Sequence, residues 1–369
     1  MTEIHNIRRA ANEVVMTGRG AAGNVSAVVE RLKAERVTVV TTPSVAASPL
    51  LDRIVSAIGP EKVTTFTESR AHTPERTVLD AADAAGSADA LVSLGGSSVV
   101  DLTKGVALVL AAGRDFDALR SNGPLRSPAL PHIAIPTTLS AAEFTAAAGI
   151  TNTERGVKEI YLGASLAPTT VILDGDLSEF TPKRLWSGTG MKLVADCIEG
   201  MLSARATRFT DALLLDALQI LLADLEAHDD ADRRQRCLEA AHMTLSNLHN
   251  VGVGATAALR HQLGGGAGLP HGEASTIVLP QVLRWNGDAA RPVLDRIAGR
   301  LGAGDANGLI ARIEETIAAL GLPARLSEVG VDAASLGAIA DHAALEMSAR
   351  SNVRPADAAG LRQILDLSY

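Results

Sequence analysis

Apolar positions in the first half of the chain alternate between short continuous runs and helical spacing. Four runs of four or five residues are typical of buried parallel strands: 37–41 (VTVVT), 90–94 (ALVSL), 132–135 (HIAI) and 170–173 (TVIL). Helical patterns lie between them at 25–32, 74–85 and 99–112. This alternation predicts a doubly wound, mostly parallel α/β sheet.

The pattern changes after Pro182, where long helical stretches rich in Ala and Leu replace the β-branched runs. Apolar residues recur at helical spacing in the segments 184–202, 211–227, 232–248, 293–301, 307–320, 334–349 and 356–367. Gly264, Gly265, Gly266 and Gly268 interrupt this half and predict a loop where backbone can approach a ligand closely.

The length of 369 residues exceeds what one hydrophobic core usually holds, which is about 250 to 300 residues. We therefore expect two domains. The first is a dinucleotide-binding α/β domain over residues 1–181, and the second is an all-helical domain over residues 182–369.

Composition excludes several classes of function. Aromatic residues make up only 2% of the chain and the net charge is −8, which disfavours base stacking and contacts to a nucleic-acid backbone. The two cysteines, Cys197 and Cys237, are too few for a disulfide framework, which suits a cytoplasmic protein. The sequence shows no secretion signal and no run of about 18 uncharged apolar residues, so we expect no membrane span.

The segment 90–104 leads from a buried strand through Gly95, Gly96, Ser97 and Ser98 into a helix. Such a turn fits a phosphate, because glycines let the backbone come close and free N–H groups at a helix start favour an anion. A tight turn in which Ser98 only caps the helix is the alternative.

A second small-residue turn, residues 136–140 (PTTLS), follows another predicted strand and strengthens the case for phosphate binding. Ligands of open α/β sheets lie at the carboxyl ends of the strands. The first strand ends near Thr42, where dinucleotide-binding folds often carry an acidic residue that binds ribose and repels a 2′-phosphate. The neutral Thr42 therefore permits a 2′-phosphate.

Six motifs follow one another along the chain: GGSSVVDLTK, PTTLSAAEF, GVKEIYL, ILDGDL, GTGMKLVADCIEG and HQLGGGAGLPHGEASTIVLP. Their order resembles the iron-containing alcohol dehydrogenase superfamily, with its dehydroquinate synthase-like fold, over nearly the whole chain. The short spacing within PTTLSAAE is more similar to the maleylacetate reductase branch than to the fermentative alcohol dehydrogenases. The resemblance implies a homodimer that transfers hydride between a nicotinamide and a carbonyl or alcohol in an interdomain cleft.

The same resemblance implies that NADPH or NADH is the cofactor and that Gly95, Gly96, Ser97 and Ser98 hold its pyrophosphate. The further residues expected at the cofactor are Thr42, Asp101, Thr137, Thr138, Ser140 and Lys158.

Most metal ligands of the superfamily are missing. Its metal-dependent members bind a divalent ion through an Asp, a His one helical turn later and two further His. The matching positions here hold Lys192, Asp196, Ala257 and His271. One imidazole and one carboxylate beside an ammonium are a poor site for a divalent cation, so we expect no metal.

Lys192 and Asp196 are four residues apart and share one face of a predicted helix. One interpretation is a surface ion pair worth roughly 0.3 to 0.5 kcal/mol. The other is that the Lys192 ammonium replaces the metal and polarises a substrate carbonyl or binds a carboxylate. His261 and His271 are the candidate proton donors, since histidine titrates near working pH, and a structural histidine is the alternative for each.

We interpret the chain as a metal-independent, NAD(P)H-dependent reductase or dehydrogenase of a small polar carbonyl or alcohol. One alternative is a non-redox enzyme on the same fold that catalyses elimination, cyclisation or condensation in specialised metabolism. The other is a non-catalytic nucleotide-binding subunit, against which the presence of Lys158, His261 and His271 argues.

Overall fold

The computed structural model describes residues 7 and 11–369, which form two compact units. The α/β unit contains residues 11–181 and 229–239, and the helical unit contains residues 182–228 and 240–369. We expected residues 182–369 to form the second domain, but residues 229–239 belong to the α/β unit. Arg234 and Gln235 fix that segment to the α/β unit through hydrogen bonds of 2.8 Å to the backbone of Gly175. Residues 1–6 and 8–10 of the expected first domain lie outside the described residues.

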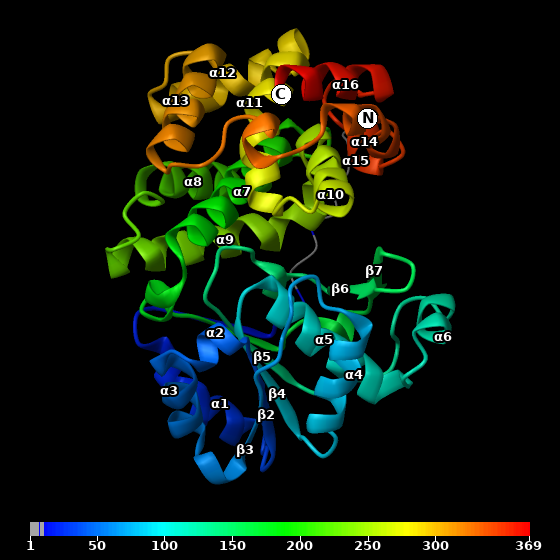
Figure 1. The fold of residues 1–369 in the computed structure, drawn as a ribbon. Helices are drawn as coiled ribbons and strands as arrows, with labels where there is room; N and C mark the ends of the chain where they lie inside the picture. Colours follow the sequence, from blue (N-terminus) through cyan, green and yellow to red (C-terminus); the bar gives the residue numbers. More distant parts are fainter. Residues whose placement is uncertain (1–6, 8–10) are drawn as a thin grey trace. The chain divides into compact units, whose positions relative to one another are not determined.

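The α/β unit is built on a six-stranded parallel sheet with the strand order β1-β8-β5-β4-β2-β3. Figure 1 labels β2, β3, β4 and β5 of this sheet. The strands are β1 (Val14–Thr17), β2 (Val37–Val40), β3 (Val63–Phe66), β4 (Ala90–Gly95), β5 (His132–Pro136) and β8 (Thr170–Leu173). The four predicted strands are confirmed to within one residue at each end. The edge strands β1 and β3 were not predicted, because they are only partly buried and have no long apolar run.

Helices cover both faces of this sheet. They are α1 (Val25–Arg31), α2 (Pro43–Ala46), α3 (Pro49–Ile58), α4 (Glu75–Ala84), α5 (Ser97–Ala112) and α6 (Phe116–Ser121). Successive residues of a strand point to opposite faces, so Val39 lies in the core beneath α1 and α3, whereas Val40 lies in the core beneath α4 and α5. The doubly wound arrangement expected from the sequence is confirmed.

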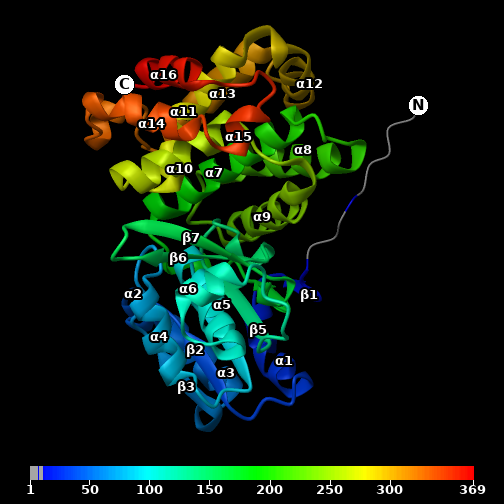
Figure 2. The ribbon, with the colours of Figure 1, turned by 90° about the vertical axis from the view of Figure 1, so that its right-hand side faces the viewer.

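An antiparallel hairpin of β6 (Ala147–Asn152) and β7 (Val157–Leu162) forms a second sheet that was not predicted (Figure 2). Its residue Ile150 enters the core shared with α4 and α5. Four of the six residues of β7 are exposed, so this strand lacks the apolar pattern by which a buried strand is predicted.

Lys104 of α5 fixes the segment before this hairpin. The side chain is completely buried, and its Nζ donates hydrogen bonds to Ala142 O (2.7 Å), Thr145 Oγ1 (3.0 Å) and Ala147 O (2.9 Å). Burial lowers the pKa of Lys104 to about 8. Three oxygen acceptors match the three donors of an ammonium, so α5 and the chain that follows β5 are held together at one point.

The described part of the helical unit contains helices and short 3-10 turns, as expected for an all-helical domain. The helices are α7 (Lys183–Leu202), α8 (Arg208–Asp224), α9 (Ala231–Val251), α10 (Ala255–Ala267), α11 (His271–Asn286), α12 (Arg291–Leu301), α13 (Ala306–Ala319), α14 (Leu336–Ala343), α15 (Met347–Arg350) and α16 (Ala358–Leu367), with α9 starting in the α/β unit. Helices α10, α11, α14 and α16 share one apolar core (Figure 1). No helix of the described residues is both long and apolar enough to span a membrane.

The expected glycine loop is wrong. Gly264, Gly265 and Gly266 lie within α10, which ends at Ala267, and its C-cap Gly268 has the left-handed conformation (φ +67°). A Cβ at Gly264 would lie 2.9 Å from the ring of His271, so the missing side chain lets α11 pack closely against α10. Tertiary packing therefore outweighs the low helix propensity of glycine here.

The predicted helix over 334–349 is also wrong in part. Helix α14 ends at Ala343 and α15 begins at Met347, with Glu346 between them in an extended conformation (φ −72°, ψ 143°). At this break the Glu346 side chain contacts His261 and Gln262 of α10. Helices α10 and α11 were not predicted either, and α11 contains Pro280 in its interior.

Candidate active site

The turn from β4 into α5 has the close backbone packing of a ligand cradle. Gly95 has φ +150°, and a Cβ there would lie 2.8 Å from Val99 Cγ2. Gly96 is the N-cap of α5, and no side chain caps the helix. The alternative that Ser98 only caps this helix is therefore wrong, and the first N–H groups of α5 remain suited to an anion.

The turn after β5 lies against the first one, as expected from neighbouring strands. Gly95 pairs with Pro136 across the sheet, and the Thr137 N–H donates to Gly95 O at 3.1 Å. A Cβ on Gly96 would lie 3.2 Å from Thr138 Oγ1. The Thr138 hydroxyl in turn donates to Ser140 Oγ at 3.1 Å. The structure thus places two of the predicted phosphate-binding segments in contact.

Asp101 and Lys158 form a second part of this region. Lys158 Nζ lies 3.6 Å from Asp101 Oδ2, and the lysine side chain crosses Gly149, where a Cβ would overlap its Cε. Burial raises the pKa of Asp101, against the opposing effect of Lys104 and Lys158. Asp101 therefore orients the Lys158 ammonium, which is 41% exposed and accessible to a ligand.

Thr42 follows β2, next to β4 in the sheet, and it is the N-cap of α2. Its Oγ1 accepts from the Val45 N–H at 3.2 Å and lies 3.0 Å from Ser44 Oγ. The hydroxyl therefore has a structural task, whatever role the position has toward a ribose.

Sequence reasoning missed the loop that follows β3. His72 and Thr73 have positive φ values of 62° and 50°, which are unfavourable for residues other than glycine. Hydrogen bonds from Thr151 to both carbonyl groups hold them, at 2.6 Å and 2.9 Å. Thr73 Oγ1 also donates to Ser98 O at 3.3 Å, which ties this loop to the start of α5. No residue pattern in the loop signals this contact.

In the helical unit, Asp196 of α7 lies between two cations. Lys192 Nζ is 2.8 Å from Asp196 Oδ2, and Arg260 of α10 donates to Asp196 Oδ1 at 2.6 Å. Asp196 is completely buried, and the side chains of Arg260 and Lys192 are 5% and 16% exposed. The interpretation as a surface ion pair is therefore wrong. The sequence did not predict the role of Arg260, because this residue lies 64 positions after Asp196 and no local pattern indicates their contact.

The two cations decide the charge of Asp196. Burial alone raises the pKa of this carboxyl, but Arg260 and Lys192 outweigh it and hold the pKa below its usual value. Each carboxylate oxygen thus faces a positive charge. Ala257, at another position that the resemblance matches to a metal ligand, has no donor atom. In the part of the chain that the structure describes, no cluster of three His, Cys, Asp or Glu side chains is placed to bind a metal.

Glu199, one turn after Asp196, explains where α10 begins. Its carboxylate accepts hydrogen bonds from the N–H groups of Gly254 (2.8 Å) and Thr256 (2.7 Å). Burial raises the pKa of Glu199, and these bonds oppose that shift. Glu199 thus serves the scaffold and positions the helix that carries Arg260 and His261.

The two candidate proton donors lie together. The ring centroids of His261 and His271 are 5.6 Å apart. His261 Nδ1 lies 2.8 Å from Glu346 Oε2, and Gln262 Nε2 donates to Glu346 Oε1 at 2.7 Å. Glu346 was not predicted, because it lies within a segment whose helical pattern concealed the break before α15.

Comparisons with known proteins agree with the fold. A family model described as iron-containing alcohol dehydrogenase matches residues 12–175, and one for the C-terminal part of the Fe-containing alcohol dehydrogenase family matches residues 187–369. The chain is 30% identical over 364 residues to dehydrogenase ALT3 of Alternaria alternata, covering 86% of this chain and 94% of that protein.

Two further relatives cover nearly full length. An NAD-dependent methanol dehydrogenase of Bacillus methanolicus is 28% identical over 366 residues, covering 94% of this chain and 96% of the relative. The crystal structure of maleylacetate reductase from Agrobacterium tumefaciens is similar with a TM-score of 0.84 at 26% identity, over 100% of this chain and 99% of that one. The resemblance inferred from motif order is confirmed.

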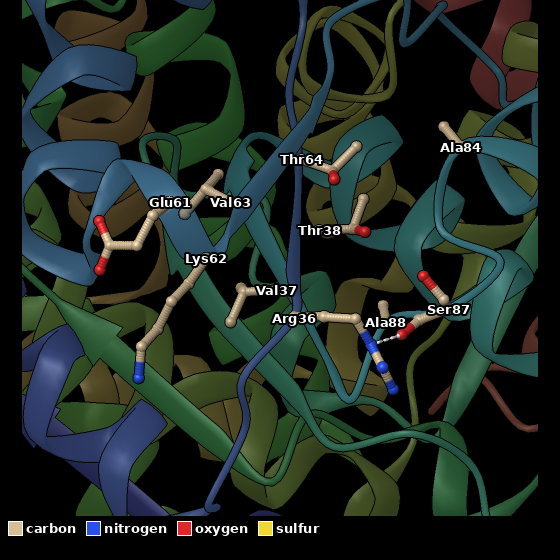
Figure 3. A pocket seen from close by; sticks show the side chains of 10 residues that line it. All are labelled: Arg36, Val37, Thr38, Glu61, Lys62, Val63, Thr64, Ala84, Ser87 and Ala88. Atoms are coloured by element: carbon tan, nitrogen blue, oxygen red, sulfur yellow. Dashed lines mark hydrogen bonds between the residues drawn. The ribbon is translucent and has the colours of Figure 1, made fainter.

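A hollow elsewhere on the α/β unit is not part of this site. It has a volume of about 110 Å³ and lies at the amino ends of β2 and β3, the opposite edge from the two turns (Figure 3). Arg36, which lines it, donates to Ser87 O and pairs with Asp89, and Lys62 pairs with Glu35. Its two basic side chains, Arg36 and Lys62, thus belong to ion pairs of the scaffold.

Removing Arg260 should destabilise the protein strongly. We expect Arg260→Met to lower the free energy of unfolding by about 3 to 5 kcal/mol, since the buried Asp196 then loses one of its two cations. The control is Arg284→Met, which breaks an exposed pair with Glu314 and should cost less than about 1 kcal/mol. Denaturant titration measures both changes, and equal effects would contradict the importance given to the buried pair.

Proposed function

Because the chain belongs to the iron-containing alcohol dehydrogenase family, we propose that it transfers hydride between a nicotinamide dinucleotide and a small polar carbonyl or alcohol. The observation that carries this proposal is the contact between the uncapped Gly96 turn and Thr138, two small-residue turns at the carboxyl ends of neighbouring strands. Such a place suits the pyrophosphate of a dinucleotide.

We further propose that the reaction needs no metal. A divalent ion in this family of folds would serve as a Lewis acid toward the substrate oxygen. The resemblance matches Lys192 and Asp196 to two of the metal-ligand positions, and Asp196 pairs with both Lys192 and Arg260. These three side chains together carry a net charge of +1, which disfavours a divalent cation beside them. Arg260 holds one oxygen of Asp196, so the partly exposed Lys192 ammonium keeps further N–H donors for a substrate oxygen.

The chemistry requires two groups beside the nicotinamide. In the reducing direction hydride adds to the carbonyl carbon and a proton must reach the carbonyl oxygen. Lys192 would stabilise the negative charge that develops on this oxygen, as a preorganised donor does. His261 or His271 would deliver the proton, since an imidazole can give and regain one near neutral pH.

Cofactor choice gives one test. We expect NADPH to bind at least as well as NADH, because Thr42 carries no charge. Thr42→Asp should weaken NADPH binding roughly tenfold relative to NADH, since a like charge near the 2′-phosphate costs at least about 1 kcal/mol. Both Asp and the control Thr42→Asn can still cap α2. Isothermal titration decides, and a strong preference for NADH in the unaltered protein would contradict the assignment.

Metal content gives the next test. The purified protein should contain well under one iron or zinc ion per chain. Added Fe²⁺ or Zn²⁺ should leave the melting temperature unchanged, because Lys192 and Arg260 already bind both oxygens of Asp196. Elemental analysis and thermal melts with and without a chelator measure this. About one metal ion per chain, or a rise in Tm on adding it, would show that the protein is a metalloenzyme.

Lys192 provides the sharpest test of the chemistry. Lys192→Met leaves Arg260 bonded to Asp196, so the protein should still fold and bind NADPH, while kcat falls roughly a hundredfold or more through loss of one preorganised donor. The exposed Lys183→Met in the same helix is the control and should have no effect. Full turnover in a folded Lys192→Met protein would falsify the role of the ammonium.

A further inference from the structure

We propose that Glu346 is a positioning residue that holds His261 with Nε2 free to exchange the reaction's proton. The inference rests on the proposed function, because it assigns a partner to one of the two candidate proton donors. It concerns a residue that no motif of the chain marks.

The contacts of Glu346 indicate that its side chain positions His261 rather than capping its own helix. Glu346 is the N-cap of α15, yet its carboxylate makes no capping bond to that helix. It reaches α10 instead, where His261 Nδ1 lies 2.8 Å from Oε2 and Gln262 Nε2 donates to Oε1 at 2.7 Å. Ser348 Oγ adds a donor at 3.2 Å from Oε2. Oε2, the oxygen that faces His261, therefore accepts from two donors, and Gln262 bonds only to Oε1.

The charge of Glu346 suits this task. Burial raises the pKa of its carboxyl, but the bonds from His261 and Gln262 outweigh that effect and hold the pKa below its usual value. The group is therefore a carboxylate at neutral pH and can only accept hydrogen bonds. His261 must then carry its proton on Nδ1, in the neutral as well as the charged imidazole.

This arrangement leaves Nε2 as the nitrogen that gains and loses a proton. The side chain of His261 is 42% exposed, so the ring is accessible to a ligand. Among the described residues, the His271 ring at the start of α11 also faces it. A carboxylate that fixes the tautomer and orientation of a histidine is a known way to make the opposite nitrogen an efficient acid or base.

A purely structural role for the contact is the competing explanation, in which Glu346 only fastens α15 to α10. Gln262 separates the two ideas, since it bonds the other oxygen of the same carboxylate from the next residue of α10. If fastening were the whole role, Gln262→Ala and Glu346→Ala would have similar effects. If positioning is the role, only Glu346→Ala should alter His261 and the reaction.

The test combines nitrogen NMR of histidine-labelled protein with steady-state kinetics, using the full chain and NADPH with a panel of small carbonyl compounds. We expect His261 to show the Nδ1–H tautomer in the unaltered protein and in Gln262→Ala, and to lose it in Glu346→Ala. For Glu346→Ala, kcat should fall roughly tenfold or more while KM changes by no more than about twofold. Gln262→Ala should keep kcat within about twofold.

The two readouts distinguish the possible failures. An unchanged His261 tautomer in Glu346→Ala, or an equal fall of kcat in Gln262→Ala, would overturn the positioning role even in an active reductase. Absence of turnover in the unaltered protein with every carbonyl would overturn the proposed function and, with it, the part of Glu346 in proton exchange.

Discussion

The buried carboxylate of Asp196 is the constraint on which the candidate site in the helical unit depends. A charge inside a protein costs several kcal/mol unless other charges and hydrogen bonds compensate it. Lys192 does this from the same helix, and Arg260 does it from α10. Glu199, one turn further along α7, caps the first turn of α10. Two carboxylates of α7 therefore determine both where α10 begins and which of its side chains faces α7.

The register of α10 then determines the place of His261. Neighbouring residues of an α-helix point about 100° apart. Once Arg260 is directed into the buried cluster, His261 must point elsewhere, and its side chain is 42% exposed while that of Arg260 is 5% exposed. Glu346 meets His261 there because the chain breaks between α14 and α15. The position of a candidate proton donor is thus a consequence of an ion pair on the neighbouring side of the helix.

The α/β unit follows a different principle, which is close approach of backbone. Gly95 and Gly96 leave no space for a Cβ without contact to Val99 and Thr138, and the same lack of side chains leaves the start of α5 accessible. Lys104 holds α5 to the chain after β5. The small residues Gly95 and Gly96 and the buried Lys104 ammonium keep the turns after β4 and β5 together. A phosphate bound at these turns would contact backbone N–H groups rather than side chains.

The sequence by itself determined the features that depend on local pattern. Continuous apolar runs predicted β2, β4, β5 and β8, because a strand buried on both faces leaves that trace in any sequence. The small-residue turns were also recognisable, because their glycine, serine and threonine residues are consecutive in the sequence. The shared face of Lys192 and Asp196 followed from their spacing of four residues. The edge strands and the hairpin of β6 and β7 left a weaker trace, since partial exposure removes the periodicity.

Only the tertiary structure decided the contacts between residues far apart in the chain. Arg260 reaches Asp196 across 64 residues and Glu346 reaches His261 across 85. It also decided that Gly264 lies within a helix, where the His271 ring occupies the place that a side chain would take. Such pairings cost loop entropy and are stabilised only by the packing of whole helices, so no short stretch of sequence contains them.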